Sequence, residues 1–348
     1  MGFAAIGSSS SSLRALSLSN PSQRLKGAGE VQNHQPAKLT LPCSHKWRMV
    51  IAYDGTKFSG WQYQQFPPTI QYLIENALIR ITKLDRKELR LVGASRTDTG
   101  VHAWGQVAHF VTPFTYDSLQ SLHAAMNGLL PPEIRVREIS PALPEFHARF
   151  STKSKTYHYK IYNNPIMDPF LSLYAYHSAH KLNPAAMREA AAYFVGKHDF
   201  SSFANASHND RLPDHVKEIF RFDINEMGAV LQLEVEGTGF LYRQVRNMVA
   251  LLLQIGREAL PPNVVPKILA AQDRRELAKF ALSAPPHGLC LMSVNYDHDI
   301  LKPPEVGPDI SFGRTHQVSK CGFGDMLLPA SKKGFPNLRS WYQGAPIT

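Results

Sequence analysis

Strand-like and helix-like segments follow one another irregularly in this chain, and their order limits the fold more than any single motif does. Residues 156–163 alternate between polar side chains and aromatic or apolar ones, the period-2 pattern of a half-buried strand. Residues 69–81 place apolar side chains at i, i+3, i+4 spacing, the pattern of an amphipathic helix. Both kinds of segment occur in each half without a regular βαβ repeat, so the sequence predicts an α+β fold.

The same patterns predict the remaining elements. Helices are expected over residues 118–129, from Asn183 and Pro184 onward, and over about 240–255 with two shorter helices after it. Strands are expected at 48–53, 89–92, 106–111, 134–139, 220–225, 229–235 and 289–295. We therefore expect two similar halves of sheet and helix, 47–150 and 151–298.

The two ends of the chain differ from this folded region. Residues 1–46 contain the serine run Ser8–Ser12, several basic residues and a single acid, Glu30. A serine-rich, basic and acid-poor start is typical of an organellar transit peptide, and the excess of serine favours the chloroplast over the mitochondrion. A disordered tail is the alternative. Residues 299–348, rich in proline, glycine and basic residues, are expected to be a flexible tail.

Charge and cysteine content leave few other classes open. The net charge is +10, but residues 1–46 and 301–348 carry +4 and +3 of it, so a surface that binds phosphates would need local clustering. The three cysteines form no CxxC pair and the histidines show no ligand spacing, so neither a disulfide framework nor a metal site is predicted. No apolar stretch approaches the roughly 18 residues of a membrane helix.

The densest chemistry lies in the expected loop 93–103, which reads Gly-Ala-Ser-Arg-Thr-Asp-Thr-Gly-Val-His-Ala. Its glycines allow a tight turn or a close approach to a ligand. Asp98 stands between two threonines, and a loop between strands is where functional sites gather. From these residues alone, a turn aspartate that accepts backbone hydrogen bonds explains the pattern as well as a catalytic one.

This loop resembles the signature of the TruA family of pseudouridine synthases, arginine-threonine-aspartate-x-glycine-valine-histidine. Further matches follow in the family's order and cover about residues 47–297: Tyr53-Asp54-Gly55 with Gly60-Trp61-Gln62, Thr69-Ile70-Gln71, Phe146–Ser151 before Tyr157-His158-Tyr159, Val245–Val249, and Ala284-Pro285 with Gly288-Leu289. The resemblance implies the pseudouridine synthase fold, a mixed and largely antiparallel central sheet. It also implies an isomerase that converts uridine to pseudouridine in tRNA, with positions 38–40 of the anticodon stem-loop as targets.

Roles are implied at the matching positions. Asp98 corresponds to the catalytic aspartate and Arg246 to the arginine that pairs with it. Tyr157 corresponds to the tyrosine that packs against the target base, and Arg96 to an arginine that fills the space left by the extruded nucleotide. His102 is a further expected substrate-binding residue, and Tyr242 a neighbour of the site.

The reaction is redox-neutral and needs no cofactor. The carboxylate can add to C6 of the base, add to C1′ of the ribose, or take a C2′ proton, and the sequence leaves all three routes open. Family members act as homodimers, so a homodimer with tRNA as partner, and with no metal or membrane, is expected. Residues 205–217 resemble the family poorly.

Two other classes of protein function are alternatives to the isomerase. A non-catalytic RNA-binding protein of the same fold would lack the aspartate, whereas Asp98 is present. A metal-dependent nucleic-acid hydrolase needs several carboxylates or histidines in ligand arrangement, and a single aspartate beside arginines does not supply them.

Overall fold

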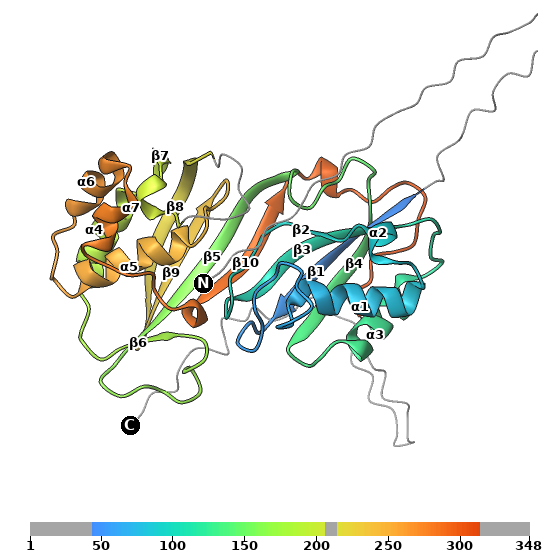
Figure 1. Ribbon diagram of the computed structural model, residues 1–348, viewed down its shortest axis with the longest axis horizontal. Coiled ribbons are helices and arrows are strands. Elements are labelled where there is room, and N and C mark those ends of the chain that lie inside the picture. The colour runs from blue at the N-terminus through green and yellow to red at the C-terminus, as the bar shows by residue number, and fades with distance from the viewer. Residues whose placement is uncertain (1–43, 206–213, 314–348) are drawn as a thin grey trace, which may run out of the picture. The chain divides into compact units, whose positions relative to one another are not determined.

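The protein is built around one mixed sheet (Figure 1). The computed structural model describes residues 44–205 and 214–313. The strands run in the order β4-β1-β3-β10-β5-β9-β8-β7, with the short β2 beside β3 and β6 beside β5. Their bounds are β1 (His45–Tyr53), β2 (Val92–Gly93), β3 (His102–Thr112), β4 (Ile134–Ala142), β5 (Thr152–Asn163), β6 (Tyr176–Ser178), β7 (Gly196–Asp199), β8 (Val216–Met227), β9 (Val230–Gly237) and β10 (Leu289–Tyr296).

The helices gather at the two ends of this sheet. They are α1 (Ile70–Thr82), α2 (Arg86–Leu89), α3 (Leu119–Leu129), α4 (Pro184–Ala192), α5 (Gln244–Gly256), α6 (Val264–Ala271) and α7 (Arg274–Ala278), with 3₁₀ turns at Ser201–Phe203, Pro286–Gly288 and Asp299–Leu301. Figure 1 shows α1 and α3 in front of β1 and β4, and α4 to α7 grouped at the other end. Among the described residues, no helix is long and apolar enough to cross a membrane.

Most strand pairs are antiparallel, and β10 connects the two ends of the sheet. It pairs in parallel with β3 through Cys290 and Leu291, and antiparallel with β5 along its length. The expected α+β architecture with a mixed, largely antiparallel sheet is confirmed. The division into two halves at residue 150 stays a prediction. Strand β10 belongs to the second half by sequence, but it pairs with β3 of the first half as well as with β5 of the second.

Apolar periodicity explains why these elements form where they do. In β1, Trp47, Met49 and Ile51 are buried at every second position. In α1, Ile70, Ile74, Ala77 and Leu78 form one buried face. These faces meet in the main hydrophobic core, which also includes residues of α5 and β9.

Three local expectations were wrong. The strand expected at 89–92 begins only at Val92, as the two-residue β2, because Asp85 and Glu88 cap a helical turn that ends at Leu89. Helix α5 begins at Gln244 rather than near 240, because Arg243 has the left-handed conformation (φ +60°), which ends the helical path. Strand β1 begins at His45, inside the segment expected to precede the fold.

The first part of the expected C-terminal tail also has a defined place. Ser311 and Ile139 of β4 exchange two backbone hydrogen bonds of 2.9 and 3.0 Å. The Ser311 hydroxyl lies 3.0 Å from Nδ1 of buried His123 in α3. The described part of this segment thus attaches to the edge of the sheet as far as Ser311. Residues 314–348, like residues 1–43 of the expected transit peptide, lie outside the described residues.

Candidate active site

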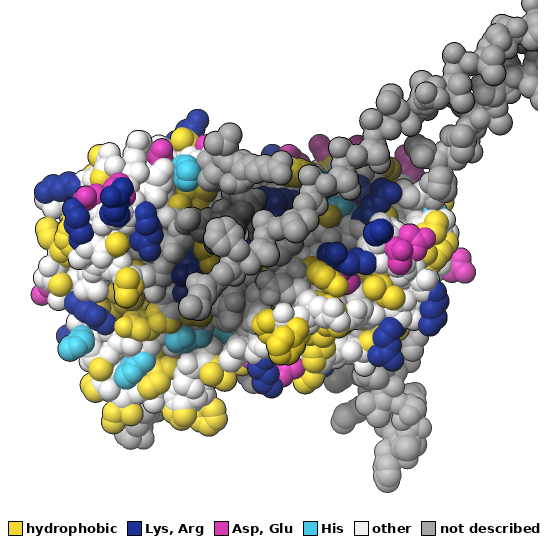
Figure 2. Space-filling model, in the orientation of Figure 1, with side chains coloured by type: hydrophobic (Ala, Val, Ile, Leu, Met, Phe, Trp, Pro, Cys, Tyr) yellow, Lys and Arg dark blue, Asp and Glu magenta, His cyan; other side chains and the backbone are white. Residues whose placement is uncertain are grey.

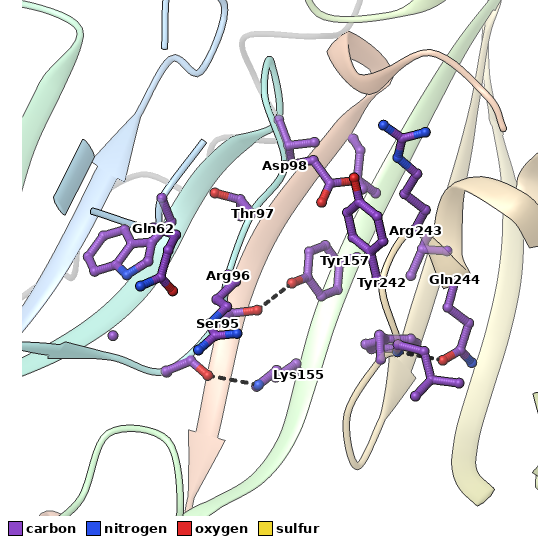
Figure 3. Close-up of a pocket in the computed structure, with 18 of the residues that line it drawn as sticks. Gln62, Ser95, Arg96, Thr97, Asp98, Lys155, Tyr157, Tyr242, Arg243 and Gln244 are labelled. Carbon is purple, nitrogen blue, oxygen red and sulfur yellow. Dashed lines mark hydrogen bonds between the residues drawn. The ribbon is translucent and has the colours of Figure 1, made fainter. Parts of the chain in front are cut away.

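The loop between β2 and β3 is held by its own backbone and by the segment before α1. Trp61 N donates to Thr97 O (3.0 Å), and Val101 N donates to Asp98 O (3.1 Å). Gly100 has φ +76°, a conformation that a residue with a Cβ adopts only at a cost, so it closes the turn after Asp98. The turn directs the Asp98 side chain toward α5 at the other side of the cavity (Figure 3).

A buried glutamine of β3 fixes the other end of this loop. Gln106 is 0% exposed, and its amide accepts a hydrogen bond from Ser95 N (3.1 Å) and donates one to Ser95 O (2.7 Å). The same amide donates to Tyr53 Oη (3.4 Å), which shares a hydrogen bond of 2.8 Å with Thr97 Oγ1. The residues on both sides of Arg96 are therefore anchored to the sheet.

The Asp98 carboxylate is paired with the Arg246 guanidinium. Arg246 Nη1 donates to Asp98 Oδ2 at 3.0 Å, and the two side chains are 9% and 18% exposed. Arg246 Nε also donates to Ala284 O (2.7 Å), which fixes the guanidinium in one orientation. A guanidinium held in this way offsets the charge of the carboxylate and restricts its rotation. The expected pairing of these two residues is present.

Tyr157 lies on the floor of the cavity with its ring held from two sides. Its hydroxyl shares a hydrogen bond of 2.7 Å with Ser95 Oγ, and Phe240 packs edge-on at 5.3 Å between ring centroids. Burial raises the pKa of Tyr157, and the nearby charge of Asp98 raises it further. The hydroxyl stays protonated at neutral pH, so Tyr157 offers a neutral aromatic face and one polar group.

Lys155 lies two residues before Tyr157 on β5 and faces the same cavity. Its Nζ donates to Ala94 O (2.8 Å) at the start of the loop (Figure 3). Burial lowers the pKa of Lys155 to about 8, and the charge of Arg149 contributes to the shift. Lys155 was not among the residues expected at the site, although the two-residue period of a strand places it on the face of Tyr157.

Two expected site residues have very different positions. Arg96 is exposed and lines the cavity between the anchored Ser95 and Thr97, with no hydrogen bond or ion pair to another described residue. The His102 ring does not reach the cavity. Its Nδ1 accepts from Gly55 N (3.1 Å), and its Nε2 donates toward Leu173 O and His287 O. These contacts hold His102 within the fold, so the structure does not bring it to the substrate site.

The cavity has a volume of about 1050 Å³ and lies between α1 and the start of α5. Six basic side chains line it against two acidic ones, Asp98 and Asp214; the basic residues are Arg96, Arg149, Lys155, Lys217, Arg243 and Arg246. Figure 2 shows Lys and Arg side chains at both ends of one face of the molecule. Net charge concentrated in a concave site attracts a polyanion, so the local clustering that the overall charge did not reveal is present here.

The cavity is also lined by Tyr242, Arg243 and Gln62, of which only Tyr242 was expected as a neighbour of the site. Tyr242, expected as a neighbour, lies beside Asp98 in Figure 3, and Arg243 extends past it. Gln62 lines the opposite wall, near Arg96. Nothing in the sequence marked Gln106, because its partners lie on a loop of irregular geometry. Among the described residues, no group of three or more His, Cys, Asp or Glu side chains is placed to hold a metal ion.

Comparison with known proteins assigns this arrangement to a family. A family model described as "tRNA pseudouridine synthase" matches residues 49–151 and 190–297. The protein named tRNA pseudouridine synthase A 1 of Protochlamydia amoebophila (strain UWE25) is 42% identical over 256 residues, 73% of this chain and 98% of that protein. The proteins named tRNA pseudouridine synthase A of Bacillus pumilus (strain SAFR-032) and Bacillus subtilis (strain 168) are 40% and 39% identical over 73% and 72% of this chain and 100% and 99% of their own lengths.

Among solved structures, the "Crystal Structure of a Cbf5-Nop10-Gar1 Complex" includes a chain with a TM-score of 0.25 and 10% identity, over 59% of this chain and 54% of that one. A likeness at that level carries no conclusion about the fold. The two segments matched by the family model contain Asp98 and Arg246, and Tyr157 lies between them.

Proposed function

This chain belongs to the TruA family of tRNA pseudouridine synthases, and we propose that it isomerises uridine to pseudouridine in tRNA with Asp98 as the catalytic carboxylate. The observation that carries the proposal is the Asp98–Arg246 pair, whose atoms lie 3.0 Å apart at the wall of a large basic cavity. All three routes to pseudouridine use the carboxylate of the aspartate, and the fixed guanidinium of Arg246 holds that carboxylate in one orientation.

The isomerisation breaks the C1′–N1 bond of the nucleoside, turns the detached uracil, and forms a C1′–C5 bond. The C5 proton is lost to solvent, and N1 gains a proton, so the product is an isomer of the substrate. The base therefore has to leave its RNA stack and remain enclosed while it turns. The cavity of about 1050 Å³ has room for a flipped nucleotide. The fixed ring of Tyr157 supplies a flat surface against which the base packs, with its neutral hydroxyl beside the polar edge.

Arg96 supports the flipping step. Its side chain is exposed at the cavity, while Ser95 and Thr97 on either side are buried and hydrogen-bonded. A long cationic side chain on an anchored loop can enter the RNA helix and occupy the space that the extruded nucleotide leaves. Carboxylate addition to C6, addition to C1′ and removal of a C2′ proton all remain compatible with this geometry.

Three finer features are part of the proposal. The targets are uridines at positions 38–40 of the anticodon stem-loop, a homodimer binds the tRNA, and residues 1–46 direct the chain to the chloroplast, with the mitochondrion as alternative. The first two rest on the family resemblance. The third rests on the serine-rich, acid-poor composition of a segment of which residues 1–43 lie outside the described residues.

The test is Asp98→Asn, measured as tritium release from tRNA labelled at C5 of uridine. We expect less than a few per cent of the wild-type rate, with tRNA affinity and thermal unfolding nearly unchanged, because the amide has the size of the carboxylate but no charge. Asp117→Asn, which changes an exposed aspartate just before α3, is the matched control and should react at the wild-type rate. Substantial tritium release by Asp98→Asn would exclude the assigned role. A wild-type protein that binds tRNA without releasing tritium would favour the alternative, a non-catalytic RNA-binding protein.

A further inference from the structure

Two arginines beside the cavity have buried nitrogen atoms without a hydrogen-bond partner. Among the described residues, four buried side-chain polar atoms lack such a partner, and two of them are Arg243 Nε and Arg274 Nη1. The other two belong to Tyr116 and Gln244. A buried N–H group without an acceptor is costly, so two such groups on neighbouring cations call for a physical reason.

Asn205 links Arg274 to the residue that precedes Arg243. Asn205 N donates to Tyr242 O (3.0 Å), which ties Asn205 to the residue before Arg243. The Asn205 side-chain oxygen accepts from Arg274 Nε (3.2 Å) and from Asn247 Nδ2 of α5 (3.0 Å). Arg274, the first residue of α7, is thereby fixed against the start of α5, where Arg243 lines the cavity.

No carboxylate of the described residues neutralises this pair. The acids nearest to Arg274 in sequence are already used, because Asp273 pairs with Arg275 and Glu276 with Lys279. Burial lowers the pKa of Arg274, and the positive charge of Arg243 lowers it further. The two cations therefore repel each other in the free protein.

Arg243 has a backbone conformation that fits a functional position. It stands before α5 with φ +60° and ψ +11°, the left-handed region that is unfavourable for a side chain with a Cβ. Its guanidinium lies 5.1 Å from the centroid of the Tyr242 ring, and Figure 3 shows it extended past Asp98, away from Gln244. From this strained backbone Arg243 lines the cavity.

We propose that Arg243 and Arg274 together bind one phosphodiester group of the substrate RNA, next to the nucleotide that enters the cavity. The assignment rests on the proposed function. A phosphodiester carries one negative charge and two free oxygens that accept hydrogen bonds, which suits two guanidinium groups that lack acceptors. Its charge removes the repulsion between the cations. A contact to the phosphate does not touch the edge of the base. It therefore contributes to the position and the affinity of the RNA, and it does not depend on which nucleotide is bound.

The experiment compares tRNA affinity over a range of salt concentrations for Arg243→Gln, Arg274→Gln and the double variant. Loss of one phosphate contact should reduce the slope of log affinity against log salt by about 0.7–0.9 and weaken binding several-fold at low salt. Both arginines hold the same phosphate. The double variant should therefore lose little more tRNA affinity than whichever single variant binds tRNA less tightly. Single-turnover rates at saturating enzyme should fall far less than affinity.

Arg275→Gln is the matched control, because Arg275 is the next residue of α7 and its side chain is 89% exposed. It should keep the wild-type slope. Arg274→Lys, which retains the charge, should keep most of the slope while losing part of the affinity, and it guards against a glutamine variant that unfolds. Wild-type slopes for Arg243→Gln and Arg274→Gln would overturn the proposal, as would two independent, additive losses. Failure of the proposed function would be seen separately, as a wild-type protein that forms no pseudouridine.

Discussion

Arg246 and Asp98, 148 residues apart in the chain, are joined by a hydrogen bond of 3.0 Å between Nη1 and Oδ2. One partner comes from the first turn of α5 and the other from the loop before β3. The contact therefore exists only when the two ends of the sheet are correctly assembled. It links the integrity of the fold to the state of the carboxylate that the proposed reaction uses.

Arg246→Ala should slow the reaction by roughly one to two orders of magnitude, and Arg246→Lys by less. Loss of one partner of a buried pair costs about 3–5 kcal/mol, and each 1.36 kcal/mol added to the barrier is about tenfold in rate. About half of that loss is expected in the transition state. Lysine restores the charge but cannot bind Asp98 and Ala284 O with a planar fork. The measurement is a single-turnover rate with tRNA affinity alongside. A normal rate with weak binding would identify Arg246 as a phosphate contact instead.

Gln106→Leu should lower the free energy of unfolding by about 1–3 kcal/mol, because it leaves Ser95 N and O buried without partners. The reaction rate of the folded fraction should fall as well, since the loop that carries Asp98 loses its anchor. Denaturant unfolding and single-turnover rates measure the two effects. Gln120→Leu, at an exposed position of α3, is the control for adding a leucine. Equal stability of both variants would show that the Gln106 network does not hold the loop.

The pKa of Lys155 predicts a pH dependence of stability. Burial lowers this pKa to about 8, below the roughly 10.4 of a free lysine. Below pH 8 both the folded and unfolded states bind the proton, and the folded state bears the full cost of a buried charge. Between pH 8 and about 10.4 the unfolded state binds more protons, so stability rises with pH in this window, by at most about 1.4 kcal/mol per pH unit. The difference in unfolding free energy between wild type and Lys155→Met isolates this contribution. A difference that stays constant from pH 7 to 10 would rule out the shift.

Removal of residues 1–43 should leave the single-turnover rate unchanged, because β1 begins at His45 and its pairing with β3 and β4 is intact. Fusion of residues 1–46 to a fluorescent protein should carry it into chloroplasts. The same fluorescent protein fused to residues 47–92 is a control of similar length and should not be imported. Diffuse cytosolic fluorescence of the first fusion would contradict the transit-peptide interpretation.

Much of the fold could be predicted because its signals are local. The alternation in β5 and the helical spacing in α1 are consequences of one buried face each, and both were recognised. The central position of β10 was not, since strand order depends on contacts between residues far apart in sequence. Helix α2 was missed because a capping box at Asp85 and Glu88 outweighed the strand-like apolar residues of the segment 89–92.

The site divides in the same way. The motif placed Asp98 and Arg246, and the structure brings them together. It could not show that His102 turns away, because the direction of each side chain in an irregular loop is set by backbone torsions and not by spacing. Lys155 could have been predicted from the two-residue period of its strand. The link between Arg274 and the residue before Arg243 runs through Asn205 and has no local sequence signal.

The central place of β10 has a consequence for biosynthesis. Strands β3 and β5 have no direct pairing with each other, and β10, at Leu289–Tyr296, fills the gap between them. During translation, the N-terminal strands can pair early, but the ribosome must release the last of these residues before the two ends of the sheet can join. A nascent or prematurely terminated chain therefore has Asp98 and Arg246 on separate fragments of sheet. Competence for catalysis is acquired in one late step, after β10 at Leu289–Tyr296 of the 348-residue sequence has emerged.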